Sequence, residues 1–463
     1  MLAPIEILAR LKERLVTALE GLHLTQDAGL LSVILELPQA PTFAPPLAGP
    51  RFQFAHRDRN RLQAGYGIAA EWRASGAGRL RQLRAQAVQL RASWQQLDVD
   101  ETGQRGFALL GFAASPTEAG GHGDGTLPDA LLWIPELAIV SERGRGALVL
   151  STPLPADPEG LRSRWAAWLE RLLPLLASEQ ADTTSVATRL RRSLDRPDIA
   201  EWEELVYAAL TEIDQGRLDK VVISRRLRVA TPRAFDLQRL MIVLGELFPS
   251  CQLIELSRGQ TSFVAATPER LLAQHGDQVE VDAIAGTVAR AASLDRDVEL
   301  SEALTNSAKD RREHDLVIQA VRTALASCSR EVAVPPHPSV MQLRNAQHLW
   351  SPVRARLDPG MDVLTLAELL HPTPATNGEP RRAASAWLRR SEAVDRGWYT
   401  GAAGIITPDL TGELWVLLRC AEINGATADL FAGAGIVAGS DPLCEWQETE
   451  DKLAAMLTAL ELA

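Results

Sequence analysis

Lysine is scarce in this chain of 463 residues, in which four lysines stand against 44 arginines. Arginine keeps its proton, whereas lysine can lose one when its surroundings lower its pKa and can then act as a base. Lys12, Lys220, Lys309 and Lys452 are therefore candidates for chemistry that arginine cannot perform. The alternative for each of them is survival by chance.

Cysteine is also sparse, and apolar runs are short. The four cysteines lie far apart without a Cys-x-x-Cys pair, which argues against a disulfide framework and a zinc ribbon. No stretch approaches the roughly 18 apolar residues of a membrane span. Charged residues interrupt the N-terminal segment, which is unlike a signal or transit peptide, so we expect a cytoplasmic protein without a membrane partner. A net charge of −11 disfavours nucleic acid as a partner.

What is present is the composition of an ordinary globular protein, with 46% hydrophobic and 23% charged residues. The length allows two or three domains, or one unusually large one. A polar stretch before residue 196 gives the best internal boundary, so we divide the chain into residues 1–195 and 196–463. We expect the two parts to build one composite domain.

The second part alternates short strands with a few helices. We predict helices over 201–215 and 299–326 and from residue 445, a strand over 219–225, a meander over 251–288 and three strands over 398–437. Tight turns join consecutive strands, and such strands are antiparallel. The fold class is therefore α+β with large antiparallel sheets.

Two of these helices carry acidic residues that share a face. Asp310 and Glu313 are one turn apart, and Glu445, Glu448 and Lys452 follow the same spacing near the C-terminus. Two carboxylate pairs could hold a hard divalent cation such as Mg²⁺ together with an anionic substrate. On spacing alone, surface ion pairs such as Glu448 with Lys452 are the better explanation, because acidic helix faces are common.

A glycine-rich segment, 432–439, follows a predicted strand. Its glycines do not have the spacing of a dinucleotide-binding loop, and no βαβ unit surrounds them, so a nicotinamide site is excluded. Backbone N–H groups around Gly433 and Gly435 could still hold a carboxylate. A turn that needs small residues is the alternative.

Nine segments in the same order resemble the chorismate-utilising enzymes, the family of isochorismate synthase, salicylate synthase and the large subunit of anthranilate synthase. The resemblance covers about residues 200–463. The segments are Asp-Lys-Val-Val (219–222), Thr-Pro-Glu-Arg (267–270), Ala-Gly-Thr (285–287), Lys-Asp-Arg-Arg-Glu-His (309–314), Gln-His-Leu (347–349), His-Pro-Thr-Pro-Ala (371–375), Leu-Arg-Cys-Ala (418–421), Phe-Ala-Gly-Ala-Gly-Ile-Val (431–437) and Glu-Trp-Gln-Glu-Thr (445–449).

The resemblance implies a fold and a set of binding residues. The fold is that of anthranilate synthase component I, in which large antiparallel sheets pack as a sandwich with helices outside. The substrate is chorismate, which carries two carboxylates, and the cofactor is Mg²⁺. The metal ligands are Glu313 and Glu448, flanked by Asp310 and Glu445. The substrate-binding residues are Gly286, Thr287, His348, Ala375, Tyr399, Arg419, Gly433, Gly435 and Lys452.

The resemblance also implies two catalytic residues. Lys220 matches the general base that activates water for attack at ring carbon C2, and Glu269 matches the general acid that protonates the departing C4 hydroxyl. A lysine with its ordinary pKa of about 10.4 is a poor base at pH 7, so the site has to lower that value. Ammonia-using relatives carry glutamine at the position of Lys220, so no glutamine amidotransferase subunit is expected.

Three functions are compatible with these residues. An isochorismate synthase would feed menaquinone or siderophore biosynthesis and is favoured, because the other enzymes of the family tend to have threonine at the position of Ala375. A salicylate synthase would add a pyruvate elimination at the same site. A catalytically silent chorismate-binding subunit would have lost Lys220, Glu269, Glu313 or Glu448. No coiled-coil seam is visible, so we expect a monomer or a weak dimer.

Overall fold

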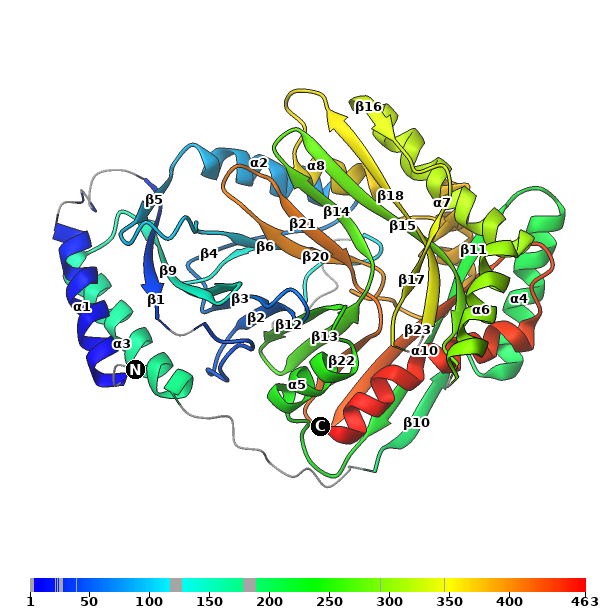
Figure 1. Ribbon diagram of the computed structural model, residues 1–463, viewed down its shortest axis with the longest axis horizontal. Coiled ribbons are helices and arrows are strands. Elements are labelled where there is room, and N and C mark those ends of the chain that lie inside the picture. The colour runs from blue at the N-terminus through cyan, green and yellow to red at the C-terminus, as the bar shows by residue number, and fades with distance from the viewer. Residues whose placement is uncertain are drawn as a thin grey trace.

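The computed structural model describes residues 4–463 except 21, 23, 25–27, 39, 117–126, 178–188, 292 and 345. Its strands form two large sheets with helices on their outer faces (Figure 1). Every strand pairing described is antiparallel except that between β1 and β5. The predicted α+β sandwich with helices outside is confirmed.

The first sheet has thirteen strands in the described part of the chain. In spatial order they are β10 (Arg191–Arg196), β11 (Lys220–Ala230), β23 (Thr427–Ile436), β22 (Cys420–Asn424), β13 (Thr261–Thr267), β12 (Gln252–Arg258), β2 (Arg51–His56), β3 (Arg61–Tyr66), β8 (Leu137–Glu142), β9 (Arg145–Leu154), β1 (Gly29–Leu37) and β5 (Trp94–Asp98), with β19 (Gly378–Glu379) beside β11.

The second sheet has ten strands within the same described residues. In spatial order they are β16 (Ser329–Ala333), β18 (Ala346–Leu357), β15 (Gln278–Ala289), β14 (Arg270–His275), β21 (Gly412–Val416), β20 (Ala402–Ile406), β6 (Ala108–Phe112), β7 (Ala130–Ile134) and β4 (Ala70–Ala74), with β17 (Ser339–Gln342) beside β18.

Side chains alternate between the two faces of each sheet, and both faces are apolar. One face of each sheet therefore packs on the other sheet, and the opposite face packs on helices. Inward-facing residues such as Phe52, Trp133 and Phe263 form the core between the sheets. The outer face of the first sheet packs on α1 (Pro4–Glu20), α3 (Pro158–Ala177), α5 (Leu237–Leu247) and α10 (Pro442–Leu462). The outer face of the second packs on α2 (Arg79–Arg91), α7 (Ala308–Ala326) and α8 (Val363–Leu370). A smaller cluster joins β11 and β23 to α4 (Ile199–Asp214) and α9 (Arg381–Ser391).

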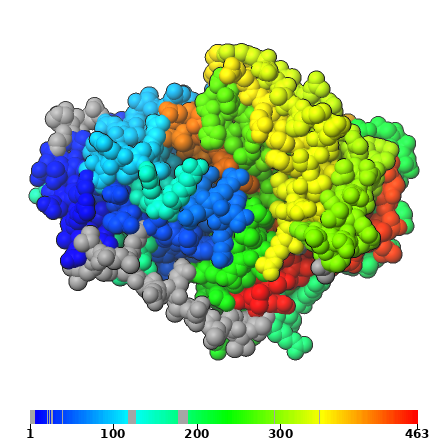
Figure 2. Space-filling model, in the orientation of Figure 1, coloured from blue at the N-terminus to red at the C-terminus, as the bar shows by residue number. Residues whose placement is uncertain are grey.

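Strands from both parts of the sequence pair with each other in each sheet. β2 pairs with β12 in the first sheet, and β6 pairs with β20 in the second. Figure 2 shows the surface of the orange segment that includes β20 and β21 enclosed between the light blue and green segments. This pairing is what a single composite domain requires, and the division at residue 195 stays a prediction.

Three details differ from the sequence prediction. The single helix expected over 299–326 is two helices, α6 (Leu294–Asn306) and α7, because the hydroxyl of Ser307 accepts the N–H of Asp310 and starts a new helix there. The stretch 398–437 holds four strands rather than three, β20 to β23. The meander over 251–288 is divided, with β12 and β13 in the first sheet and β14 and β15 in the second.

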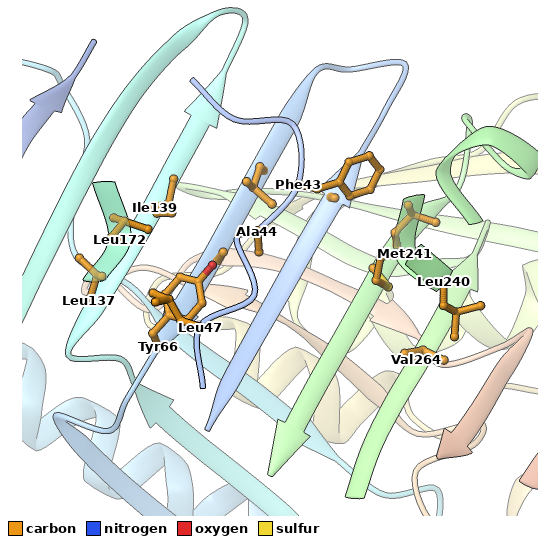
Figure 3. Close-up of a cluster of buried hydrophobic side chains, with 14 of the residues drawn as sticks. Phe43, Ala44, Leu47, Tyr66, Leu137, Ile139, Leu172, Leu240, Met241 and Val264 are labelled. Carbon is orange, nitrogen blue, oxygen red and sulfur yellow. The ribbon is translucent and has the colours of Figure 1, made fainter. Parts of the chain in front are cut away.

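The segment before β2 contributes to the core without regular structure. Phe43, Ala44 and Leu47 lie over the outer face of the first sheet, with Phe43 toward Met241 and Leu47 toward Tyr66 (Figure 3). The Tyr66 hydroxyl donates to the carbonyl of Pro45 at 2.9 Å, which fixes this segment on the sheet. Among the described residues, no helix combines the length and apolar character needed to cross a membrane.

Candidate active site

The candidate residues meet at one end of the sandwich, on the inner face of β11 and β23. Val221 and Ile223 pack under α4, so Lys220 and Val222 point to the opposite face. On β23, Phe431 packs in the core between the sheets, and Gly433 and Gly435 continue on the same side. Two glycines and a lysine therefore replace the large apolar side chains that fill the rest of this layer.

The two glycines leave room for polar groups. A Cβ atom on Gly435 would lie 2.9 Å from Cε of Lys220 and 3.2 Å from Oε1 of Glu313. A Cβ atom on Gly433 would lie 2.9 Å from both the Tyr399 hydroxyl and the carbonyl oxygen of Ile223. Both positions follow the carbonyl and N–H pattern of β11 and β23, so neither glycine serves a turn.

We expect the substitution Gly435→Ala to lower activity strongly, because the added methyl group displaces Lys220 from Glu313. Misplacement of a reacting group by about 1 Å can cost on the order of 100-fold in rate. Turnover should be measured beside thermal stability. The control is Gly425→Ala in the exposed turn between β22 and β23, where a Cβ meets nothing within 4 Å and only backbone strain at φ 57° is added. A Gly435→Ala enzyme with wild-type turnover would contradict this assignment.

Three of the four lysines lie in this region, and each is paired with one glutamate. The first two pairs join elements far apart in sequence, and the third spans one turn of α10. The Nζ to Oε1 distances are 2.7 Å for Lys220 and Glu313, 3.2 Å for Lys309 and Glu445, and 2.6 Å for Lys452 and Glu448. The scarcity of lysine thus pointed to the site, although sequence reasoning assigned no role to Lys309.

Lys220 and Glu313 form the most deeply placed of these pairs. The Lys220 side chain, at the first residue of β11, is 1% exposed. Burial works to raise the pKa of Glu313, but Lys220 and the two neighbouring lysines outweigh it and hold that pKa below its ordinary value. Glu313 is therefore an anion in a site rich in cations.

The nearby lysine offsets the effect of burial on Glu445 of α10 only in part. Burial and the nearby charge of Glu448 raise the pKa of Glu445, and Lys309 only partly opposes them. The Nζ of Lys452 donates both to Glu448 and, at 2.9 Å, to the carbonyl of Gly433. That carbonyl is accessible because β22 begins at Cys420, level with Phe431, and does not extend along this part of β23.

Glu269 lies where the chain passes from β13 of one sheet to β14 of the other. Its carboxyl is buried, and its backbone carbonyl accepts the N–H of Val416. Burial raises the pKa of Glu269 to about 8, with Lys220 opposing the rise and Asp282 adding to it. At neutral pH this side chain is a protonated acid close to Lys220.

His348 connects Arg419 to the bulge in β15 at Gly286 and Thr287. Its Nε2 accepts from Arg419 at 3.3 Å, because a guanidinium can only donate, so Nδ1 carries the hydrogen and donates to the Thr287 hydroxyl at 3.0 Å. Burial and Arg419 lower the pKa of His348 to about 3, which keeps the ring neutral. Gly286 has φ 78° at a bulge in β15, where a Cβ would press on Asp310.

Tyr399 borders the site next to Gly433. Its ring stacks on Phe431 with centroids 5.4 Å apart, and burial raises the pKa of its hydroxyl. Thr400, the next residue, has φ 61°, and Arg419 has φ 47°. Positive φ at residues with a side chain costs energy and persists where the surrounding structure imposes it, as is common at functional sites.

Two predicted features, the substrate-binding role of Ala375 and the metal site, are less clear in the structure. Ala375 is half-buried, and its methyl group packs against the hydrophobic core of the second sheet. Among the described residues, no three histidine, cysteine, aspartate or glutamate side chains gather closely enough to hold a metal ion. The carboxylates have the right chemistry for a hard cation, but lysines engage three of them.

Comparison with known proteins identifies the family of the chain. The chorismate binding enzyme family matches residues 18–461. The salicylate biosynthesis isochorismate synthase of Pseudomonas aeruginosa is 40% identical over 262 residues, which are 56% of this chain and 54% of that protein. This chain therefore matches just over half the length of that relative.

Two solved structures share the fold. The menaquinone-specific isochorismate synthase MenF of Escherichia coli superposes with a TM-score of 0.76 and 26% identity, covering 96% of this chain and all of that one. Anthranilate synthase component I of Streptococcus pneumoniae gives a TM-score of 0.63 at 21% identity, covering 76% of this chain and 80% of that one. The second likeness concerns the fold alone.

Proposed function

Since the chain belongs to the chorismate binding enzyme family, we propose that it is an isochorismate synthase, which adds water at C2 of chorismate and releases the C4 hydroxyl. The observation that carries the proposal is that the buried side chains of Lys220 and Glu269 lie close enough for their charges to interact, with Lys220 bonded to Glu313. One site thus offers an amine that can serve as a base and a carboxyl that can serve as an acid. The proposed product would feed menaquinone or siderophore biosynthesis.

In this proposal Lys220 takes a proton from water as the oxygen attacks C2. A protonated amine cannot do this, and in the structure the amine of Lys220 donates to Glu313. The pair therefore has to separate when substrate binds. A carboxylate of chorismate beside Arg419 and Lys452 would change the charge balance around Glu313 and Lys220.

Glu269 supplies the proton that the departing hydroxyl needs. A hydroxide ion is a poor leaving group, so protonation in the transition state lowers the barrier. The raised pKa of Glu269 keeps the proton on the carboxyl at neutral pH. His348 would hold Arg419 in place for a substrate carboxylate without adding a charge of its own.

We further propose that Mg²⁺ binds here with the substrate, held by Glu313 and Glu448, with Asp310 and Glu445 acting through water. Charge counting supports this. Before substrate binds, four cations, Lys220, Lys309, Lys452 and Arg419, balance these four acids in their ionised forms. A substrate with two carboxylates would leave two uncompensated negative charges, which a divalent cation neutralises. Bound Mg²⁺ would stabilise negative charge on the substrate.

The test is to incubate the purified chain with chorismate and Mg²⁺, separate the products and assay pyruvate, with a parallel sample in EDTA. We expect isochorismate without pyruvate, and loss of turnover in EDTA that added Mg²⁺ restores. Turnover that is unchanged in EDTA, and equally unchanged in Glu313→Gln and Glu448→Gln variants, would contradict the metal assignment.

The other outcomes identify the alternative functions. Salicylate with an equal amount of pyruvate would show a salicylate synthase, and Ala375 would then have been misleading. Absence of turnover, with chorismate still protecting the chain against heat, would indicate a silent binding subunit.

A further inference from the structure

Arg396 lies beside the site, on the segment between α9 and β20, and is not among the residues assigned above. Its side chain is 9% exposed. Its five N–H groups match five hydrogen bonds: two to the Glu392 carboxylate at 2.7 and 2.9 Å, one each to the carbonyls of Val222 and Thr376 at 2.6 and 2.7 Å, and one to the Thr400 hydroxyl at 3.5 Å.

Each of the three segments bound by this guanidinium carries a candidate site residue next to the contact. Val222 lies two residues after Lys220 on β11, so the two side chains share a face. Thr376 directly follows Ala375. Thr400 directly follows Tyr399 and has the positive φ described above.

Glu392 extends the same connection. Its Oε1 accepts the backbone N–H of Ser224 at 2.8 Å, so the pair holds β11 at Val222 and Ser224, two residues apart along one edge of the strand. Further bonds complete this edge of the sheet: the N–H of Val222 donates to Asn377 at 3.0 Å, and that of Asp219 donates to Glu379 at 2.8 Å. Hydrogen bonds thus join the segment 376–379 to the chain around Lys220, both before it, at Asp219, and after it, at Val222.

Arginine is required for this arrangement. A guanidinium offers five donors in a rigid plane, whereas lysine offers three on one nitrogen and cannot reach acceptors in four residues at once. A buried ion pair also loses much hydration, which its hydrogen bonds have to offset. The stabilising interactions here are directed mainly at backbone atoms of separate segments, which fixes their relative position.

We propose that Arg396 and Glu392 form a positioning pair that holds Lys220, Ala375 and Tyr399 in register with one another. This inference rests on the proposed function for its kinetic effect. Neither side chain contacts the substrate, and both act through the three segments.

The first test compares Arg396→Lys with Arg51→Lys. Arg51 is a matched control, because it also pairs with a buried glutamate, Glu255, and donates to the carbonyl of Leu47, in a part of the first sheet without candidate site residues. We expect Arg396→Lys to lower kcat by about 10- to 100-fold with KM changed by less than about threefold. We expect Arg51→Lys to lower the melting temperature and leave kcat unchanged.

The second readout is amide hydrogen exchange, which needs no substrate. In Arg396→Lys the amides of Asp219 and Val222 should exchange faster than in the wild type, and in Arg51→Lys they should not. This arm decides the positioning of β11 even if the wild-type chain proves inactive on chorismate, so failure of the proposed function is recognised separately.

Two results would overturn the inference. One is wild-type kcat together with wild-type exchange at Asp219 and Val222 in Arg396→Lys. The other is an equal loss of kcat in Arg51→Lys, which would show that general destabilisation is the cause. If Arg396→Lys does not fold, Glu392→Gln takes its place, with Glu255→Gln as its control. We then expect a smaller loss of kcat and a smaller increase in amide exchange at Asp219 and Val222.

Discussion

Replacing Lys220 with glutamine will reduce isochorismate formation by about 10²- to 10⁴-fold, the usual contribution of a general base, while chorismate still binds. Glutamine is polar and only one bond shorter than lysine, but it cannot take a proton from water. Arginine at this position will fail as well, because its charge can pair with Glu313 but its proton is not released.

The measurement is product formation for the Lys220→Gln, Lys220→Arg and Lys12→Gln variants, with thermal protection by chorismate as the binding readout. Lys12 is the matched control, because it pairs with Glu170 on the surface, far from the site. Near-normal turnover of Lys220→Gln would show that another group is the base.

Replacing Glu269 with glutamine will produce a loss of similar size, about 10²- to 10⁴-fold, because the amide cannot protonate the leaving hydroxyl. In the wild type, activity should fall as the pH rises through about 8, where Glu269 loses its proton. The rate should therefore be followed from pH 6 to pH 10. A rate that stays level across this range would contradict the assignment of Glu269 as the acid.

The raised pKa of Glu269 also predicts how the free energy of unfolding depends on pH. Its pKa is about 8 in the folded chain and 4.5 as its ordinary value, so between these values only the folded state holds the proton. The contribution of Glu269 to the free energy of unfolding then falls as the pH rises across this window, by at most about 1.4 kcal/mol per pH unit.

Glu269→Gln removes this dependence. Its free energy of unfolding, measured in urea at pH 5, 7 and 9, should rise relative to the wild type between pH 5 and pH 8 and then stay level. Glu422→Gln is a suitable control, because burial raises the pKa of Glu422 as well but at a residue outside the site. An unchanged difference between Glu269→Gln and the wild type at all three pH values would show that Glu269 is ionised when folded.

Much of the site could be predicted from the sequence because its residues lie in short segments whose types are informative. Gly433 and Gly435 alternate along a strand after Phe431, and Lys220 is one of four lysines. The pairing of Lys220 with Glu313 could not be derived from spacing, because it depends on how α7 packs against the sheets. The break at Ser307 was missed because the single predicted helix joined Leu304 to Val317 across a polar stretch.

Long-range contacts explain the other differences. β13 and β14 are neighbours in sequence but belong to different sheets, since the short link at Glu269 crosses the sandwich rather than turning back. Arg396 is one arginine among many, so its type carries no signal. Only the carbonyls of Val222 and Thr376, brought together by the fold, give it a role.

The scarcity of lysine has a practical consequence for chemical labelling. An amine-reactive reagent usually reports on the whole surface of a protein, but here it has four side chains to choose from. Lys309 is 51% exposed, Lys12 and Lys452 are each 35% exposed, and Lys220 is 1% exposed. Lys12 lies on α1 at the opposite end of the molecule (Figure 1) and serves as an internal standard. Acylation of Lys309 and Lys452 relative to Lys12, read by mass spectrometry, would thus register occupancy of the site without any engineered tag.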